Sequence, residues 1–127
     1  MKTSISIKGT NEIVNNLKKD NALLIEVSKE AANLGAEILK EGMKEDCPVD
    51  PEDDDEEHLR DSIHTISAKQ TKNKVVAKAA AGKKTAIHVE FGTSKMDMHP
   101  FMRIQLIKHK DEIRKLVKDM VKGRLGL

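Results

Sequence analysis

The sequence predicts a single α+β domain over residues 1–127: an N-terminal strand and a long helix, an antiparallel β-meander of three to four strands, and a C-terminal helix packed on the sheet. Three observations predict this class. A chain of 127 residues is long enough for one core and too short for two. Apolar residues alternate near the start and again between 59 and 91, as in strands with one buried face. Two other segments have apolar residues every three or four positions, which is the period of a helix.

The N-terminal strand is expected at residues 3–8, because TSISIK alternates polar and apolar side chains. Gly9 then interrupts the pattern. Thr10 or Asn11 can cap a following helix, since a short polar side chain accepts a hydrogen bond from a free amide of the first turn.

The first helix is expected over residues 12–46, with a break or kink near 18–21 where the apolar period falters. Gly35 and Gly42 lie on its apolar side. Each glycine costs about 1 kcal/mol of helix propensity relative to alanine, so we expect another element to approach the helix closely there. Pro48 ends the helix, because the residue before a proline avoids the α region. The second half of this helix carries a stripe made of Leu24, Val27, Ala31, Leu34 and Ile38.

The meander is expected between residues 59 and 91 as three strands joined by short turns. Its strands are placed at 59–71, 75–79 and 85–91, with a turn at Lys72 and Asn73 between the first two. In the last strand, the buried face is expected to hold Ile87, Val89 and Phe91, and the opposite face His88 and Glu90.

The C-terminal helix is expected over residues 101–122, after a loop at 92–100. Pro100 stands where helices often begin, because its fixed φ suits a first turn. Residues 123–127 are expected to form a flexible tail. The apolar face of the helix is expected to hold Ile113, Leu116, Val117, Met120 and Val121.

Charge is strongly segregated along the chain, although its net value is only +2. Residues 50–57 carry seven acids and no base, and a solvated loop is expected at 50–58 because adjacent like charges repel. A calcium-binding EF-hand loop would need alternating acids and a central glycine, which this run lacks. Residues 68–85 hold six lysines and no acid. These lysines suit a hairpin or edge strand protected from pairing, or alternatively a surface that binds phosphates.

No catalytic residue, cofactor or metal is expected. The seven glycines form no phosphate-binding loop, the serines form no nucleophile elbow, and the five histidines lack the spacing of metal ligands. Cys47 lies beside a proline and acids, so we expect a raised thiol pKa and a buried rather than a reactive side chain. We therefore expect that the protein is not an enzyme.

The cellular context is also constrained by composition. A single cysteine allows no intramolecular disulfide, which suits a reducing compartment. The sequence shows neither the apolar core of a signal peptide nor a run long enough to span a membrane, so no membrane association is expected. The chain has two phenylalanines and no tryptophan or tyrosine, which argues against binding single-stranded nucleic acid by base stacking.

Two nearby stretches, HVEFGTSK at 88–95 and MHPFMR at 98–103, resemble the "V-E-F-G-T … P-F-[ML]-R" signature of a phage family. These are the tail-completion, or head–tail joining, proteins of long-tailed bacteriophages, typified by the tenth gene product of lambdoid coliphages. CPVD at 47–50 is similar to the family's "A-P-V-D-T-G" helix terminator, and LRDSI at 59–63 to the "L-R-x-S-I" that opens its first long strand. Residues 7–17 are similar to its opening segment. The matches follow the family order, but here Pro51 and a run of acids separate the second and third of them.

The resemblance implies a structural virion protein of a tailed phage or prophage. Such a protein completes the tail and joins it to the head, as a homo-oligomeric ring of six-fold symmetry at the head-proximal end of the tail. Its partners would be the tail tube protein and the head–tail connector or head completion protein. It would be found in the virion, and in the host bacterial cytoplasm during assembly. Two alternatives stay open: a basic nucleic-acid-binding accessory protein, and a small regulatory domain such as part of a toxin–antitoxin pair.

The residues of the motif divide into two expected roles. Glu90 is expected to point away from the buried face, to where a neighbouring subunit supplies a base. Gly92 lets the chain turn, and Phe101 is expected to fill the junction between the second helix and the sheet. Because loops carry recognition and methionines repack readily, the expected interface residues are Glu90, Thr93, Ser94, Lys95, Met96, Met98 and Arg60. The expected fold determinants are Pro48, Phe91, Gly92, Pro100 and Phe101.

Overall fold

The computed structural model of the chain describes residues 2–7, 10–16, 22–48, 58–83, 85–95 and 97–126, and only the backbone of the first two ranges. The fold is α+β, as the sequence predicts. Its elements are β1 (Lys2–Ile7), β2 (Thr10–Asn16), α1 (Ala22–Asp46), the 3-10 helix η1 (Leu59–Ser62), β3 (Ile63–Thr71), β4 (Lys74–Ala81), α2 (Ala86–Phe91) and α3 (Arg103–Leu125).

The strands form one antiparallel sheet in the order β1-β2-β4-β3. It consists of two hairpins, β1–β2 and β3–β4, joined by the pairing of β2 with β4. Lys72 has a positive φ of 54° in the turn between β3 and β4, where the sequence predicts a turn. A register shift between Ile66 and Lys69 places one extra residue in β3, a β-bulge in a strand at the edge of the sheet.

The predicted start of the first helix is wrong. Thr10–Asn16 forms strand β2, so Thr10 and Asn11 do not cap a helix, and α1 begins only at Ala22. Ile13 lies opposite Ile5 of β1 and Ala77 of β4, which shows that β2 pairs on both sides. Pairing with two strands satisfies the backbone of this segment more fully than an isolated helical turn would. The predicted kink at 18–21 and the acidic segment 50–57 lie outside the described residues.

The predicted third strand of the meander is also wrong, so of the predicted meander only the β3–β4 hairpin forms. Residues 86–91 form the short helix α2, in which Ala86 and Glu90, four residues apart, are the buried positions. Six residues that alternate in polarity fit one turn and a half of helix as well as a strand. Ile87 and Phe91, which the strand interpretation buried, are therefore exposed.

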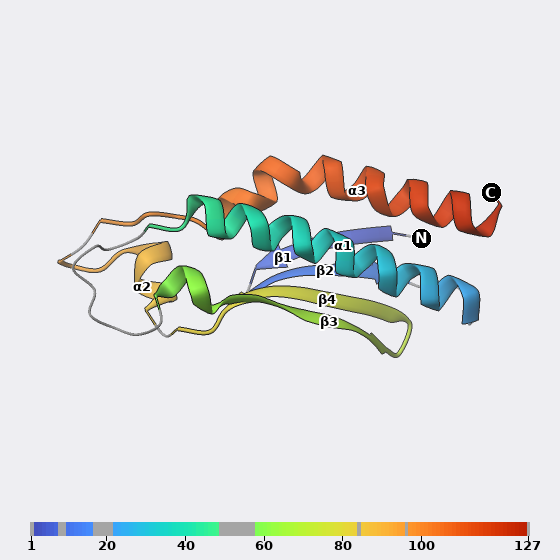
Figure 1. The fold of residues 1–127 in the computed structure, drawn as a ribbon, viewed down its shortest axis with the longest axis horizontal. Coiled ribbons are helices and arrows are strands. Elements are labelled where there is room, and N and C mark those ends of the chain that lie inside the picture. Colours follow the sequence, from blue (N-terminus) through green and yellow to red (C-terminus); the bar gives the residue numbers. More distant parts are fainter. Residues whose placement is uncertain are drawn as a thin grey trace.

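Helix α1 covers one face of the sheet, and α3 lies alongside α1 on the same side (Figure 1). The core joins α1 to β4 through mostly small or aliphatic side chains, which let the helix lie close to the sheet. These include Val27, Ala31, Leu39 and Met43 of α1 and Val75, Ala77 and Ala79 of β4.

The C-terminal helix packs mainly against α1, and its main contact with the sheet is with β1. The expectation that it packs on the sheet therefore holds for strand β1 alone among the contacts of the described residues, because α1 covers the rest of that face and α3 lies beside it. Ile113, Val117 and Val121 are its buried residues from the predicted apolar face. The helix starts at Arg103 and reaches Leu125, so most of the predicted tail at 123–127 is helical.

Gly42 of α1 lies at a point where α3 approaches closely, as the sequence predicts for this glycine. A Cβ at this position would collide with Oε1 of the buried Gln105 on α3. The Gln105 amide is held in place because its Nε2 donates hydrogen bonds to Asp46 Oδ2 at 2.6 Å and to the Phe101 carbonyl at 3.0 Å. Gly35 is likewise buried on the same helix.

Candidate interaction site

One end of the molecule gathers segments that are distant in sequence. Figure 1 shows η1 and α2 at the end of the molecule where α1 finishes and α3 begins. The connection from α2 to α3 lies there as well, so the two motif stretches 88–95 and 98–103 belong to one structural unit.

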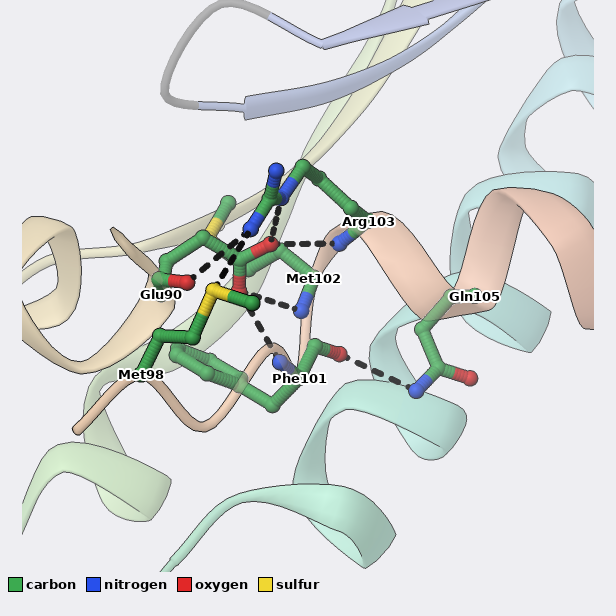
Figure 2. A network of polar contacts seen from close by, with 6 residues as sticks. All are labelled: Glu90, Met98, Phe101, Met102, Arg103 and Gln105. Carbon is green, nitrogen blue, oxygen red and sulfur yellow. Dashed lines mark hydrogen bonds and ion pairs between the residues drawn. The ribbon is translucent and has the colours of Figure 1, made fainter. Parts of the chain in front are cut away.

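Glu90 is the centre of this unit, with a residue exposure of 1%. Its carboxylate oxygens accept hydrogen bonds from the backbone N–H groups of Phe101, Met102 and Arg103, each at 2.9 Å (Figure 2). These amides precede and open α3, and a helix offers its first N–H groups no internal partner. Glu90 therefore caps α3 from another helix, and its negative charge interacts favourably with the positive N-terminal end of the helix dipole.

Arg103 completes the network from the first position of α3. Its Nε donates to Glu90 Oε1 at 2.9 Å, and a terminal nitrogen donates to the Glu90 carbonyl oxygen at 3.1 Å (Figure 2). The guanidinium also lies 4.5 Å from the centroid of the Phe91 ring, a cation–π contact. The same terminal nitrogen is 3.9 Å from the Met98 sulfur. Arg103 thus ties α2 to α3 and contacts both Phe91 and Met98.

The ionisation of Glu90 follows from these contacts. Burial by itself raises the pKa of Glu90, because desolvation disfavours a carboxylate. The three backbone N–H groups and the Arg103 side chain outweigh burial, and the pKa of Glu90 is lower than its ordinary value. Glu90 is therefore charged at neutral pH, and the ion pair with Arg103 is intact.

The expectation that Glu90 points toward a neighbouring subunit is wrong. The base that faces its carboxylate is Arg103 of the same chain, and no part of the carboxylate is left for a partner. The sequence motif itself contains both residues of this ion pair, Glu90 and Arg103, and could have predicted it. A buried glutamate needs a base, and Arg103 is the arginine that ends the second motif stretch.

Among the residues that the structure describes at this end, the exposed large apolar side chains are those of Ile87, Phe91 and Met98, with exposures of 61%, 55% and 57%. We call these three residues the α2 patch. Ile87 and Phe91 are four residues apart and share a face of α2, while Met98 contacts the same Arg103 that stacks on Phe91. The prediction of a buried Phe91 is wrong, because its strand is a helix and its ring covers Arg103 instead of the core.

The loop residues predicted for the interface are exposed where the structure describes them. Thr93, Ser94 and Lys95 are all exposed, and Thr93 Oγ1 accepts a hydrogen bond from the Lys95 N–H at 3.2 Å. Met96 lies outside the described residues. Arg60 on η1 is exposed as well, and its guanidinium donates to the Cys47 carbonyl at 3.4 Å. Their binding to a partner stays a prediction.

The other motif residues shape the backbone. Gly92 has a φ of 78°, a left-handed value that favours glycine, and its N–H closes α2 on the His88 carbonyl at 2.7 Å. Phe101 is fully buried in the core. Pro48 stands two residues beyond the end of α1. Pro100 precedes α3 by three residues instead of opening it, and the amides of Phe101 and Met102 in between donate hydrogen bonds to Glu90.

The remaining chemistry of the described residues is sparse. Cys47 is buried, and burial raises the pKa of its thiol, while the nearby Arg60 lowers it to a smaller extent. Within the described ranges, no three histidine, cysteine or acidic side chains come together as metal ligands would. No helix in those ranges has the length and apolar character needed to cross a membrane.

The fold and this end of the molecule together define a small α+β domain whose salt-bridged helix junction presents an exposed apolar patch. Residues 11–92 match the model of a protein family described as "Bacteriophage HK97-gp10, putative tail-component". Because the match covers well over half of the chain, this protein belongs to that bacteriophage family. The resemblance drawn from the motifs is thereby confirmed. Searches of curated proteins and of solved structures gave no significant match.

Proposed function

We propose that this protein completes the phage tail and joins it to the head, as a homo-oligomeric ring of six-fold symmetry at the head-proximal end of the tail. The observation that carries the proposal is the family match, since the family is described as a tail component. Such a component acts by binding other structural proteins of the virion. The partners we propose are the tail tube protein and the head–tail connector or head completion protein, with assembly in the host cytoplasm and the mature protein in the virion.

The α2 patch is the surface we propose for contact with one of these partners. Its three side chains are apolar and exposed, so their burial against a partner is favourable. Removing apolar surface from water contributes about 25 cal/mol per Å² to the free energy of binding. The Glu90–Arg103 network holds α2 against the start of α3, so that the patch needs little ordering when it binds. The exposed Thr93, Ser94 and Lys95 supply a polar rim of the kind that surrounds protein interfaces.

The test replaces Ile87 and Met98 together by serine. Both side chains are exposed, so circular dichroism and melting should stay close to the wild type. Losing two apolar interface contacts weakens binding by about 2–4 kcal/mol, or about 30- to 1,000-fold. A phage that carries the double variant should accumulate separate heads and tails in electron micrographs.

The matched control is Ile66→Ser, which changes an exposed apolar side chain of β3 outside the α2 patch. This control should leave the joining of heads and tails unchanged. If the double variant folds and its phage remains fully infectious, the α2 patch is not the joining surface. If a phage lacking the protein altogether still joins heads to tails, the proposed function itself is wrong.

A further inference from the structure

Helices α1 and α3 leave an open groove between them on the surface of the molecule. Apolar side chains form much of its lining, including Leu34, Ile38 and Leu116. Three glutamates of α1 also line it, and no lysine or arginine of the described ranges does. We call this surface the acidic groove; its charged members are Glu37, Glu41 and Glu45.

The groove stays negative when its surroundings are included. Lys40 pairs with Glu37 at 2.8 Å and approaches Glu41 at 3.8 Å, which offsets one of the three charges. On α3, His109 faces the groove, and its Nδ1 lies 3.0 Å from Glu112, a further acid. An occupant of the groove must therefore bring an apolar group together with positive charge.

Such a surface exists on α3 of the same chain. Ile107 is 83% exposed, the highest value among the exposed large apolar side chains of the described residues. Lys110, Arg114 and Lys118 follow it at the spacings that keep residues on one flank of a helix, and all are exposed. We call these four residues the basic ridge. Even with the neighbouring Asp111 counted, the charge of this flank is positive.

The ridge and the groove lie on different sides of α3. Ile107 of the ridge and Leu116 of the groove are nine residues apart, which at 3.6 residues per turn is two and a half turns. The two side chains therefore leave the helix in opposite directions. A single copy cannot place its own ridge in its own groove, but a second copy can.

We propose that copies of this chain associate head to tail, with Ile107 of one copy in the acidic groove of the next and the ridge bases against the groove glutamates. The contact is heterologous, and repeating it produces a ring when the rotation between copies closes. Ile107 contacts the apolar lining of the groove. The attraction between the ridge bases and the groove glutamates sets the relative orientation of the two copies and disfavours contacts of ridge with ridge or groove with groove. This inference rests on the proposed function, because it specifies how the ring of that function is built.

Cysteine pairing tests the contact directly in the purified full chain. With Leu34→Cys and Ile107→Cys in one chain, mild oxidation of a concentrated solution should give a ladder of disulfide-linked multimers on a non-reducing gel. The native Cys47 is buried and its raised pKa slows its reaction. The matched control is Leu34→Cys with Ile66→Cys, which offers two exposed cysteines without the ridge. Monomer alone from the first pair, or an equal ladder from the control, would overturn the proposal.

A second experiment reverses charges in the chain that carries Leu34→Cys and Ile107→Cys, and tests whether the charges form the contact. Arg114→Glu with Lys118→Glu should reduce ladder formation by more than about tenfold, and so should Glu41→Lys with Glu45→Lys. All four reversals together restore opposite charges across the contact and should restore the ladder. If the combined variant stays monomeric although its circular dichroism is native, charge complementarity does not form this contact.

Phage assembly separates this inference from the proposed function. A phage with Ile107→Asp should fail to join heads and tails if both are correct. If the ladder forms but a phage lacking the whole protein still joins heads to tails, the contact between copies stands and the head–tail joining role fails. If the ladder is absent while loss of the whole protein leaves heads and tails apart, the joining role stands and the proposed contact is wrong.

Discussion

Replacing Glu90 by glutamine removes one charge from the helix junction while keeping the shape of the side chain. In the wild type, Oε2 accepts from the N–H groups of Phe101 and Met102, and Oε1 accepts from the N–H and Nε of Arg103. A glutamine has one acceptor oxygen, and its amide nitrogen only donates. Whichever way the amide turns, two of the four donors therefore face another donor in a buried site.

The expected cost is large for a single isosteric change. Hydrogen bonds to a charged group contribute about 1.5–3 kcal/mol each, and two of the four are lost. We expect Glu90→Gln to lower the free energy of unfolding by about 3–5 kcal/mol, and to lower Tm by roughly 10–20 °C for a domain of this size. Glu26→Gln, which changes an exposed glutamate of α1, should stay within about 0.5 kcal/mol of the wild type.

The pH dependence of melting, followed by circular dichroism, identifies the charge as the cause. Because the pKa of Glu90 is lowered in the folded state, its ionisation contributes stability at pH values above the pKa of an unfolded glutamate, about 4.3. That contribution is lost as the pH falls through the lower, folded-state pKa. The difference in free energy of unfolding between the wild type and Glu90→Gln should therefore be largest at pH 7 and should decrease in acid. A gap under about 1 kcal/mol at pH 7, or one that does not narrow in acid, would refute this account.

Three further predictions concern other contacts. Gly42→Ala should lower stability by about 1–3 kcal/mol in urea denaturation, because its Cβ collides with Gln105; Gly123→Ala, whose Cβ meets nothing, should be neutral or stabilising by up to about 1 kcal/mol. Arg103→Lys should lower Tm by several degrees, since one ammonium cannot replace the separate guanidinium bonds to the Glu90 carboxylate and carbonyl; an unchanged Tm would contradict that role. The Cys47 thiol should react with a disulfide reagent more than about tenfold more slowly in the native than in the denatured chain, and equal rates would show that it is accessible.

The long elements could be read from the sequence because their patterns are local and extended. The apolar stripe of α1 repeats from Leu24 to Ile38, about four turns, and the β3–β4 hairpin is marked by its turn at Lys72. Such signals need no information about distant residues. The motif also led from the sequence to the phage family that the comparison shows.

The short elements and the site depended on tertiary contacts. Residues 10–16 become a strand because β1 and β4 offer them partners on both sides, and residues 86–91 become a helix whose Glu90 reaches the amides that open α3. These two segments, of seven and six residues, carry too few side chains for their sequence pattern to outweigh such tertiary contacts. The acidic groove is likewise a product of packing, since Gly42 allows Gln105 to bring α3 against α1. The sequence by itself determined which segments have a strong amphipathic period and which family they belong to. The tertiary structure decided which way Glu90 and Phe91 point, because a buried carboxylate lies where the unpaired N–H groups of another element can donate hydrogen bonds to it.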